Sequence, residues 1–217
     1  MARKPITCKA SKSAYYRAFR KHVLELIGRG YDQLIATDYR QCEEQAITGD
    51  LIRAMRLVVE GKSSPAWSTS FAIHDDPPLD DAERRGKERL RVDIEFERTQ
   101  RGPRPRFQFE AKRLYSSSST SKYLGVEGLG CFVDGRYSRN QEEAGLLAYV
   151  QTDDEVAWAK RISDKLSQHG QDYLLRKDGG WERFACTRLL SHTYRTRHNR
   201  CSHLKPIGIS HVFLRFL

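Results

Sequence analysis

Two neighbouring segments of the chain alternate between apolar and polar residues. Residues 91–98 have the sequence RVDIEFER, and residues 106–113 have the sequence RFQFEAKR. Because side chains alternate sides along a β-strand, each segment predicts a strand with one apolar and one charged face. A Gly/Pro-containing turn at Arg101 makes the pair a hairpin, and the antiparallel register sets Asp93 opposite Glu110. The apolar faces, which we expect to pack behind these carboxylates, include Val92, Ile94, Phe107 and Phe109.

Helical spacing of apolar residues predicts three helices, over residues 15–27, 38–60 and 153–167. Gly28 and Gly30 are expected to end the first helix, since glycine is common just beyond a helix. Asp38 is expected to cap the second helix, and Asp153 or Asp154 the third.

Further strands are predicted over residues 67–73, 145–151, 184–194 and 207–217. The second of these, GLLAYVQ, is apolar almost throughout, which is typical of a strand covered on both faces. The serine-rich run 116–121 predicts a flexible loop, and four glycines leave residues 124–137 without an assignment. Together the elements predict an α/β fold, with a central mixed β-sheet flanked by helices.

The composition is that of a basic globular protein. The chain has 217 residues, with 38 Lys and Arg against 28 Asp and Glu and a net charge of +10. Such a charge favours a polyanionic partner, and we expect nucleic acid. No repeat or linker divides the chain, so we expect a single domain over 1–217. In it, 1–37 would form a basic helical extension and 38–217 the core.

Several classes of protein are disfavoured. No apolar run approaches the length of a membrane span. A GxSxG elbow and a GxxxxGKS/T phosphate loop are both missing, which argues against a serine hydrolase and an autonomous ATPase. Five scattered cysteines without a CxxC pair indicate a reduced, cytoplasmic protein.

Two sets of arginines are candidates for nucleic-acid contacts: Arg101, Arg104 and Arg106 at the hairpin turn, and Arg195, Arg197 and Arg200 near the carboxyl end. Near the second set lie residues of zinc-binding types: Cys186, His192, His198, Cys201 and His203. Because their spacing lacks a paired zinc knuckle, we expect these histidines to join the arginines in a phosphate-binding surface instead.

The charged face of the hairpin brings Asp93, Glu110 and Lys112 to one point. Two carboxylates and an ammonium at one point can hold a divalent cation and activate water. Glu95, on the same face, is a further ligand or a supporting partner. The alternative is a solvent-exposed face of structural ion pairs.

The spacing of Asp93 and Glu110-Ala-Lys112 resembles the active-site signature of the PD-(D/E)XK, or restriction-endonuclease-like, nucleases. The likeness covers residues 38–170 and departs from the pattern at Val92, where the family name has proline. It implies a restriction-endonuclease-like core, with Mg²⁺ or Mn²⁺ bound by Asp93 and Glu110 and a water-assisting role for Lys112.

The resemblance also implies a metal-supporting glutamate on the preceding helix. Glu43 and Glu44 are both available there. We favour Glu44 because Ile47 and Leu51 follow it at helical spacing, which places its side chain against the sheet.

The function implied is a metal-dependent nuclease that hydrolyses phosphodiester bonds of DNA, with RNA less expected. A looser likeness of residues 123–132, 135–137 and 207–214 to small bacterial members implies a role in defence against foreign DNA. Because cutting both strands takes two sites and no ATP motif is present, we expect a homodimer or a subunit beside a separate motor or sensor protein. The alternative from another class is a non-catalytic nucleic-acid-binding or assembly subunit with a degenerate nuclease fold.

Overall fold

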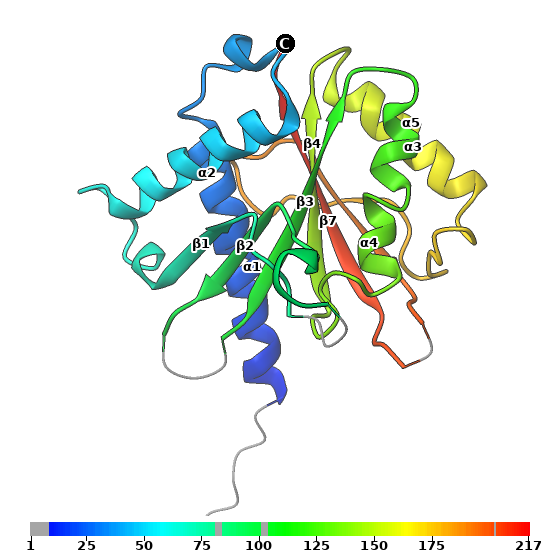
Figure 1. Ribbon diagram of the computed structural model, residues 1–217, viewed down its shortest axis with the longest axis horizontal. Coiled ribbons are helices and arrows are strands. Elements are labelled where there is room, and N and C mark those ends of the chain that lie inside the picture. Colours follow the sequence, from blue (N-terminus) through cyan, green and yellow to red (C-terminus); the bar gives the residue numbers. More distant parts are fainter. Residues whose placement is uncertain (1–8, 81–83, 101–103, 202) are drawn as a thin grey trace, which may run out of the picture.

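The computed structural model describes residues 9–80, 84–100, 104–201 and 203–217. These residues form a mixed sheet of seven strands, in the order β1-β2-β3-β4-β7-β6-β5 (Figure 1). The strands are β1 (Phe71–Asp75), β2 (Ile94–Arg98), β3 (Arg106–Leu114), β4 (Glu143–Val150), β5 (Glu182–Arg183), β6 (Thr193–His198) and β7 (Ile207–Arg215). β3, β4 and β7 are parallel, and the other neighbours are antiparallel. The predicted α/β fold with a central mixed sheet is confirmed.

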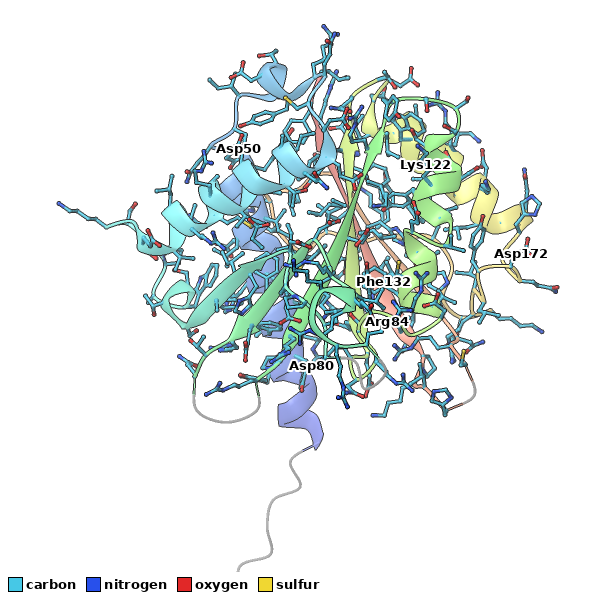
Figure 2. All side chains as sticks on the ribbon, viewed as in Figure 1. Asp50, Asp80, Arg84, Lys122, Phe132 and Asp172 are labelled. Carbon is cyan, nitrogen blue, oxygen red and sulfur yellow. The ribbon has the colours of Figure 1, made fainter. Side chains whose placement is uncertain are left out.

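Helices flank the sheet on both faces (Figure 1). They are α1 (Lys9–Tyr31), α2 (Glu44–Glu60), α3 (Ser119–Leu124), α4 (Leu129–Val133) and α5 (Glu155–Gln168), with the 3-10 turns η1 (Ala36–Tyr39), η2 (Ser68–Ser70) and η3 (Gly86–Glu88). Figure 2 shows Asp50 of α2 to one side of the sheet, and Lys122 of α3 and Phe132 of α4 to the other. The inward residues of α1 and α2 form one buried cluster, and those of α3, α4 and α5 form another.

β4 separates the two clusters. Leu147 and Tyr149 belong to the cluster under α1 and α2, whereas Leu146 and Ala148 belong to the other. The prediction of a strand covered on both faces is therefore confirmed.

α1 is longer than predicted and continues through Gly28 and Gly30. A Cβ on Gly30 would lie 2.5 Å from Met55 Cγ, and one on Gly28 would lie 2.6 Å from Leu189 Cβ. These glycines thus permit close packing and do not end the helix. The inward side chains of α1 are buried in the core: Phe19, Val23, Leu24, Leu26 and Ile27. α1 is part of the core, rather than the extension expected for 1–37.

α2 begins six residues later than predicted. Asp38 lies in η1 and caps no part of α2, and Glu43 takes the N-cap position. Glu44 is therefore the first residue of the helix. Ile47 and Leu51 are fully buried, so the helical face predicted for Glu44 is right although the start of the helix is not.

Other boundaries also differ from the sequence prediction. Residues 116–121 lead into α3 instead of forming a loop, because Ser119 Oγ accepts hydrogen bonds from the backbone N–H groups of Tyr115 and Ser116. Instead of the predicted strand over 184–194, β5 ends just before residue 184 and β6 begins at Thr193. The strand over 67–73 is shifted to β1.

α5 begins as predicted, with Asp154 as its N-cap. The Asp154 carboxylate accepts a hydrogen bond from Ala157 N at 2.7 Å. No helix in the described part of the chain is long and apolar enough to cross a membrane.

Val92 packs differently from the rest of the expected apolar face. It joins the cluster under α3, α4 and α5, whereas Ile94, Phe107 and Phe109 pack under α1 and α2. β2 starts only at Ile94, after a bend at Asp93. The bend breaks the alternation of a regular strand, so the prediction for Val92 is wrong.

Candidate active site

The site forms where β2 separates from β3. Ile94, the first residue of β2, pairs with Phe109, and β3 then continues to Leu114 alongside β4. Extending the antiparallel register by one residue sets Asp93 opposite Glu110, as the sequence predicted. The carboxyl-terminal half of β3 therefore has one edge that β2 does not cover.

Two carboxylates occupy that uncovered edge. The backbone N–H of Ala111 donates to Asp93 Oδ2 at 2.6 Å, and the N–H of Arg113 donates to Glu44 Oε2 at 3.2 Å. Buried backbone donors need acceptors, and here side-chain oxygens replace the missing strand. The same two hydrogen bonds fix Asp93 and Glu44 beside β3.

Lys112 links the acidic residues. Its Nζ donates to Glu110 Oε1 at 2.8 Å and to Glu44 Oε1 at 3.0 Å. Glu43, by contrast, has an 82% exposed side chain and pairs with Arg113. The structure thus brings Glu44, rather than Glu43, to Asp93, Glu110 and Lys112.

Burial makes the carboxyl groups of Glu110 and Asp93 hard to ionise. It raises the pKa of Glu110 to about 8, and the negative charge of Asp93 adds to the shift. Burial also raises the pKa of Asp93, although the hydrogen bond from Ala111 and the charge of Lys112 oppose it. Glu110 Oε2 is buried and has no hydrogen-bond partner among the described residues. One carboxylate oxygen therefore lies in the protein without a donor.

Lys112 keeps its proton. Burial disfavours the ammonium, but Glu110 and Glu44 together outweigh that effect and raise the pKa of Lys112. With the three carboxylates ionised, the single ammonium leaves two uncompensated negative charges. The group therefore has the formal charge that one divalent cation would neutralise.

Tyr137 and Cys131 lie beside the acidic residues of the site, and no pattern in the sequence predicted a role for either one. Burial raises the pKa of the Cys131 thiol to about 11, and the charge of Glu110 contributes. Burial and the charges of Glu110 and Asp93 likewise raise the pKa of Tyr137. Both side chains are thus uncharged at neutral pH. Because its thiol stays protonated, Cys131 is not a nucleophile there.

A second group of ligand-type side chains lies on the neighbouring strands β1 and β2. His74, Glu95 and Glu97 are the one set of described residues that places three ligand atoms within 4.8 Å of one another. The Glu44, Asp93 and Glu110 carboxylates are thus more widely spaced. Glu95 also accepts a hydrogen bond from Gln108 Nε2 at 2.6 Å and lies 3.6 Å from Arg106. Its charge is therefore already compensated.

The arginines of the hairpin turn have separate positions. Arg101 lies outside the described residues. Arg104 is exposed, with its guanidinium 4.0 Å from Glu97. Arg106 pairs with Glu95 and Glu97. Of the two arginines of this set that the structure describes, Arg104 has the more exposed side chain, 64% against 43% for Arg106.

The second set of arginines divides in the same way. Arg200 is 7% exposed and donates to the backbone oxygens of Lys205, Ser138 and Gln141, so it holds loops together and cannot contact nucleic acid as predicted. Arg195 and Arg197 instead line a cavity together with Arg106.

The expected histidine surface does not form around His198. His198 is fully buried, and its Nδ1 donates to Tyr173 O, so its Nε2 accepts from Thr196 Oγ1. Thr196 in turn accepts from His211 Nε2, and Tyr123 OH donates to His211 Nδ1. Each polar group of this chain is satisfied.

The zinc alternative also finds no support in the described residues. Both ring nitrogens of His198 are engaged, Cys186 packs against the cluster under α1 and α2, and Cys201 and His203 are exposed. These side chains do not converge on one point in the described part of the chain.

Comparison of the chain with protein-family models, with curated proteins and with solved structures finds no match.

Proposed function

We propose that this protein is a metal-dependent nuclease of the PD-(D/E)XK type. The proposal depends on one observation, the convergence of Asp93, Glu110 and Glu44 around Lys112 at the point where β2 leaves β3. Glu110 and Lys112 come from β3, Asp93 comes from the bend just before β2, and Glu44 comes from the start of the preceding helix. That is the arrangement of residues and elements on which the sequence resemblance was based.

The residues present fit a magnesium or manganese ion. Mg²⁺ prefers carboxylate oxygens and retains several waters, so it does not need a tight protein cage. Glu110 Oε2 is a buried oxygen without a donor, and a buried carboxylate oxygen of this kind is satisfied by a cation. Asp93, Glu110 and Glu44 would hold the ion. When bound, it would supply positive charge for the scissile phosphate and acidify water.

The roles of the chain's own groups follow from their contacts. The backbone of β3 orients Asp93 and Glu44 through the N–H groups of Ala111 and Arg113. Because Lys112 stays protonated, it acts as a donor and a positive charge toward the phosphate or the attacking water, not as a general base. Tyr137 limits the access of bulk water.

A cavity next to the site supports a polyanionic substrate. It has a volume of about 700 Å³ and begins at Tyr115, three residues beyond Lys112. Its wall combines two cations, Arg161 and Lys165, with the hydroxyls of Ser116, Ser117, Thr120, Ser121 and Thr152. Asp153 also lines the cavity and pairs with Arg161 at 2.6 Å, so Lys165 is the cation that this carboxylate leaves for a phosphate. Hydroxyls and cations are the groups that commonly contact nucleic-acid phosphates without reading sequence. We take DNA as the substrate and place its backbone here.

The setting in which the enzyme works is part of the same proposal. The described cysteines, Cys42, Cys131, Cys186 and Cys201, are free thiols, which supports a reducing cytoplasm. A homodimer or a complex with a motor or sensor protein would supply the second active site needed to cut both strands. Defence against foreign DNA is the role that the looser resemblance suggests.

The direct test is cleavage of plasmid and single-stranded DNA in Mg²⁺ or Mn²⁺. Asp93→Asn and Lys112→Ala should each lower the rate at least 100-fold, on the order expected for loss of a charged catalytic group. Glu60→Gln, at the exposed end of α2, is the matched control and should cleave as the wild type does. Unchanged cleavage by both site variants would show that the activity lies elsewhere.

The rival, a non-catalytic nucleic-acid-binding subunit, gives a different result. It would bind DNA with equal affinity in the wild type and in Asp93→Asn, and it would cleave in neither. Added divalent cation would then leave the thermal stability of both proteins unchanged.

A further inference from the structure

A second cavity lies at the opposite end of β3 from Lys112. It has a volume of about 710 Å³ and is bordered by the first residues of β3, β4 and β7 and by the amino-terminal half of α1. These strands begin at the lower end of the sheet in Figure 1. Arg106 lines the cavity, and Lys112 is six residues further along the strand, about 20 Å away at the rise of an extended chain. The cavity is therefore separate from the candidate active site.

The lining of this cavity is strongly basic. Its cations are Arg17, Arg106, Arg195, Arg197 and Lys205, and its carboxylates are Glu142 and Glu143. Five positive charges against two negative charges leave a formal excess of three. The side chains come from α1, β3, β6 and the segments before β4 and β7, so the fold gathers charges that are far apart in the sequence.

Both carboxylates are already neutralised within the protein. Glu142 accepts a hydrogen bond from Lys205 Nζ. Glu143 Oε1 accepts from Arg195 and also from Arg20, which is 6% exposed. The two carboxylates of the wall thus already have cationic partners. Neither of them pairs with the remaining arginines of the cavity.

Arg17 and Arg197 are the open cations. Both are exposed, and neither has a salt bridge to another described residue. The guanidinium of Arg195 lies against Gly208, where an added Cβ would be 3.0 Å from Nη2. Burial lowers the pKa of Arg195, the charge of Glu143 opposes that shift, and the charges of Arg20 and Arg197 add to it. The formal excess of positive charge in the lining favours an anion.

The rest of the wall suits an aromatic group. Tyr16 is half-buried beside Arg17, and the amide side chains of Asn140 and Gln141 also line the space. The volume is in the range of sites that enclose one small ligand.

We propose that this cavity binds a nucleotide, with its phosphates on Arg17, Arg195 and Arg197 and its base against Tyr16. Arginine forks match phosphate oxygens in pairs. The ring of Tyr16, which also lies 6.0 Å from the ring of Tyr15 in an edge-to-face contact, is the aromatic group of the wall against which a base would stack. The site goes beyond the nuclease activity, since it uses none of the residues around Lys112. It also gives a different role to Arg195 and Arg197, which the sequence predicted as contacts to a nucleic-acid strand.

Calorimetric titration of the wild-type chain in EDTA tests the proposal without any catalytic metal. The probes are ATP, ADP, inorganic tripolyphosphate, adenosine and a short single-stranded oligonucleotide. We expect ATP and ADP to bind, tripolyphosphate to bind more weakly, and adenosine to bind most weakly. Arg17→Glu and Arg197→Glu should each weaken ATP binding at least about tenfold, because each replaces a charge-assisted contact with repulsion.

Two further variants separate charge from folding. Gly208→Ala keeps every charge but displaces the Arg195 guanidinium, so it should weaken ATP binding about threefold or more. Arg53→Glu reverses an arginine on the surface of α2, 77% exposed, and should bind ATP as the wild type does. Lys112→Ala should also bind normally, which makes this result independent of the nuclease proposal.

Three results would overturn the nucleotide site. The first is no ATP or ADP binding by the wild type, and the second is equal binding by Arg17→Glu and Arg197→Glu. The third is binding of the oligonucleotide alone, which would identify the cavity as a strand contact. Equal affinity for ATP and tripolyphosphate would refute the base contact at Tyr16.

Discussion

Replacing Glu110 with glutamine should stabilise the metal-free protein at alkaline pH. The pKa of Glu110 is raised from 4.5 to about 8, chiefly by burial and then by Asp93. The pKa of Glu110 is thus higher in the folded state than in the unfolded state. Protonated Glu110 therefore contributes fully to stability below the unfolded-state pKa, and this contribution is lost as the pH rises through the folded-state pKa. At 1.36 kcal/mol per pKa unit, the raised pKa of Glu110 lowers the free energy of unfolding by about 3 kcal/mol at pH 7 and by about 4–5 kcal/mol above pH 8.

Glu110→Gln removes this titration and retains an oxygen for Lys112. Some of the gain is offset because the hydrogen bond to an ionised partner is lost. We therefore expect a net stabilisation of about 2–4 kcal/mol at alkaline pH, and close to none at pH 5. Urea unfolding in EDTA at several pH values, followed by circular dichroism, measures the difference. Glu60→Gln is the matched control and should show no such pH dependence.

Saturating Mg²⁺ should remove most or all of the stability advantage of Glu110→Gln. A ligand at about 100 times its dissociation constant stabilises a fold by about 2.7 kcal/mol. The wild type should gain this, whereas Glu110→Gln should gain much less because it lacks a ligand oxygen of full charge. If Glu110→Gln is no more stable than the wild type at pH 8.5 in EDTA, the buried, repelled carboxylate on which the argument depends does not exist.

Three further predictions follow from the same contacts and from the packing. Lys112→Ala should destabilise the metal-free protein by about 2–4 kcal/mol at pH 8, because it leaves two carboxylates without their ammonium; a loss below 1 kcal/mol in urea unfolding would contradict the pairing. Burial lowers the pKa of His198 to about 4 and that of His211 well below 6.5. Their contribution to stability is therefore present above pH 6.5 and lost as the pH falls toward 4, by about 1.4 kcal/mol per pH unit for each histidine. His198→Gln should make the measured acid slope shallower, and an unchanged slope would refute the assignment. Gly30→Ala should lower the free energy of unfolding by about 1–3 kcal/mol, because the new methyl group clashes with α2. Gly49→Ala, with nothing within 4 Å of the new methyl group, should be neutral or stabilising by about 1 kcal/mol.

The sequence predicted the local features of the site well. Period-two alternation fixed the hairpin and its register, and therefore the position of Asp93 opposite Glu110. Helical spacing fixed the face on which Glu44 lies, even though α2 starts later than expected. These features depend on contacts between near neighbours in the sequence, which periodicity reports directly.

The errors have a common physical cause, which is packing between distant segments. In the sequence, Gly28 and Gly30 have the pattern of a helix end. In the structure, they lie within α1 because Leu189 and Met55 pack closely against them. Arg200 looks like a phosphate contact until loops far along the chain supply carbonyl oxygens for it. No local pattern records such contacts, because the same residue types occur in exposed positions of other proteins.

Position 110 can be compared with position 108 on the same strand. Side chains two residues apart share a face, and both Gln108 and Glu110 are buried. Gln108 donates to Glu95 and accepts hydrogen bonds from the N–H and hydroxyl of Ser138, so both ends of its amide are satisfied. Glu110 leaves Oε2 without a partner.

A sheet that served only as a scaffold would gain stability from a neutral amide at position 110 as well. The carboxylate there is costly without a counter-ion, and it lies beside two other acidic residues that increase the cost. Local destabilisation of this kind is typical of residues whose charge is used. The contrast between Gln108 and Glu110 therefore supports a cation site at Glu110 independently of any family resemblance, and the stability of Glu110→Gln in EDTA and in Mg²⁺ measures it.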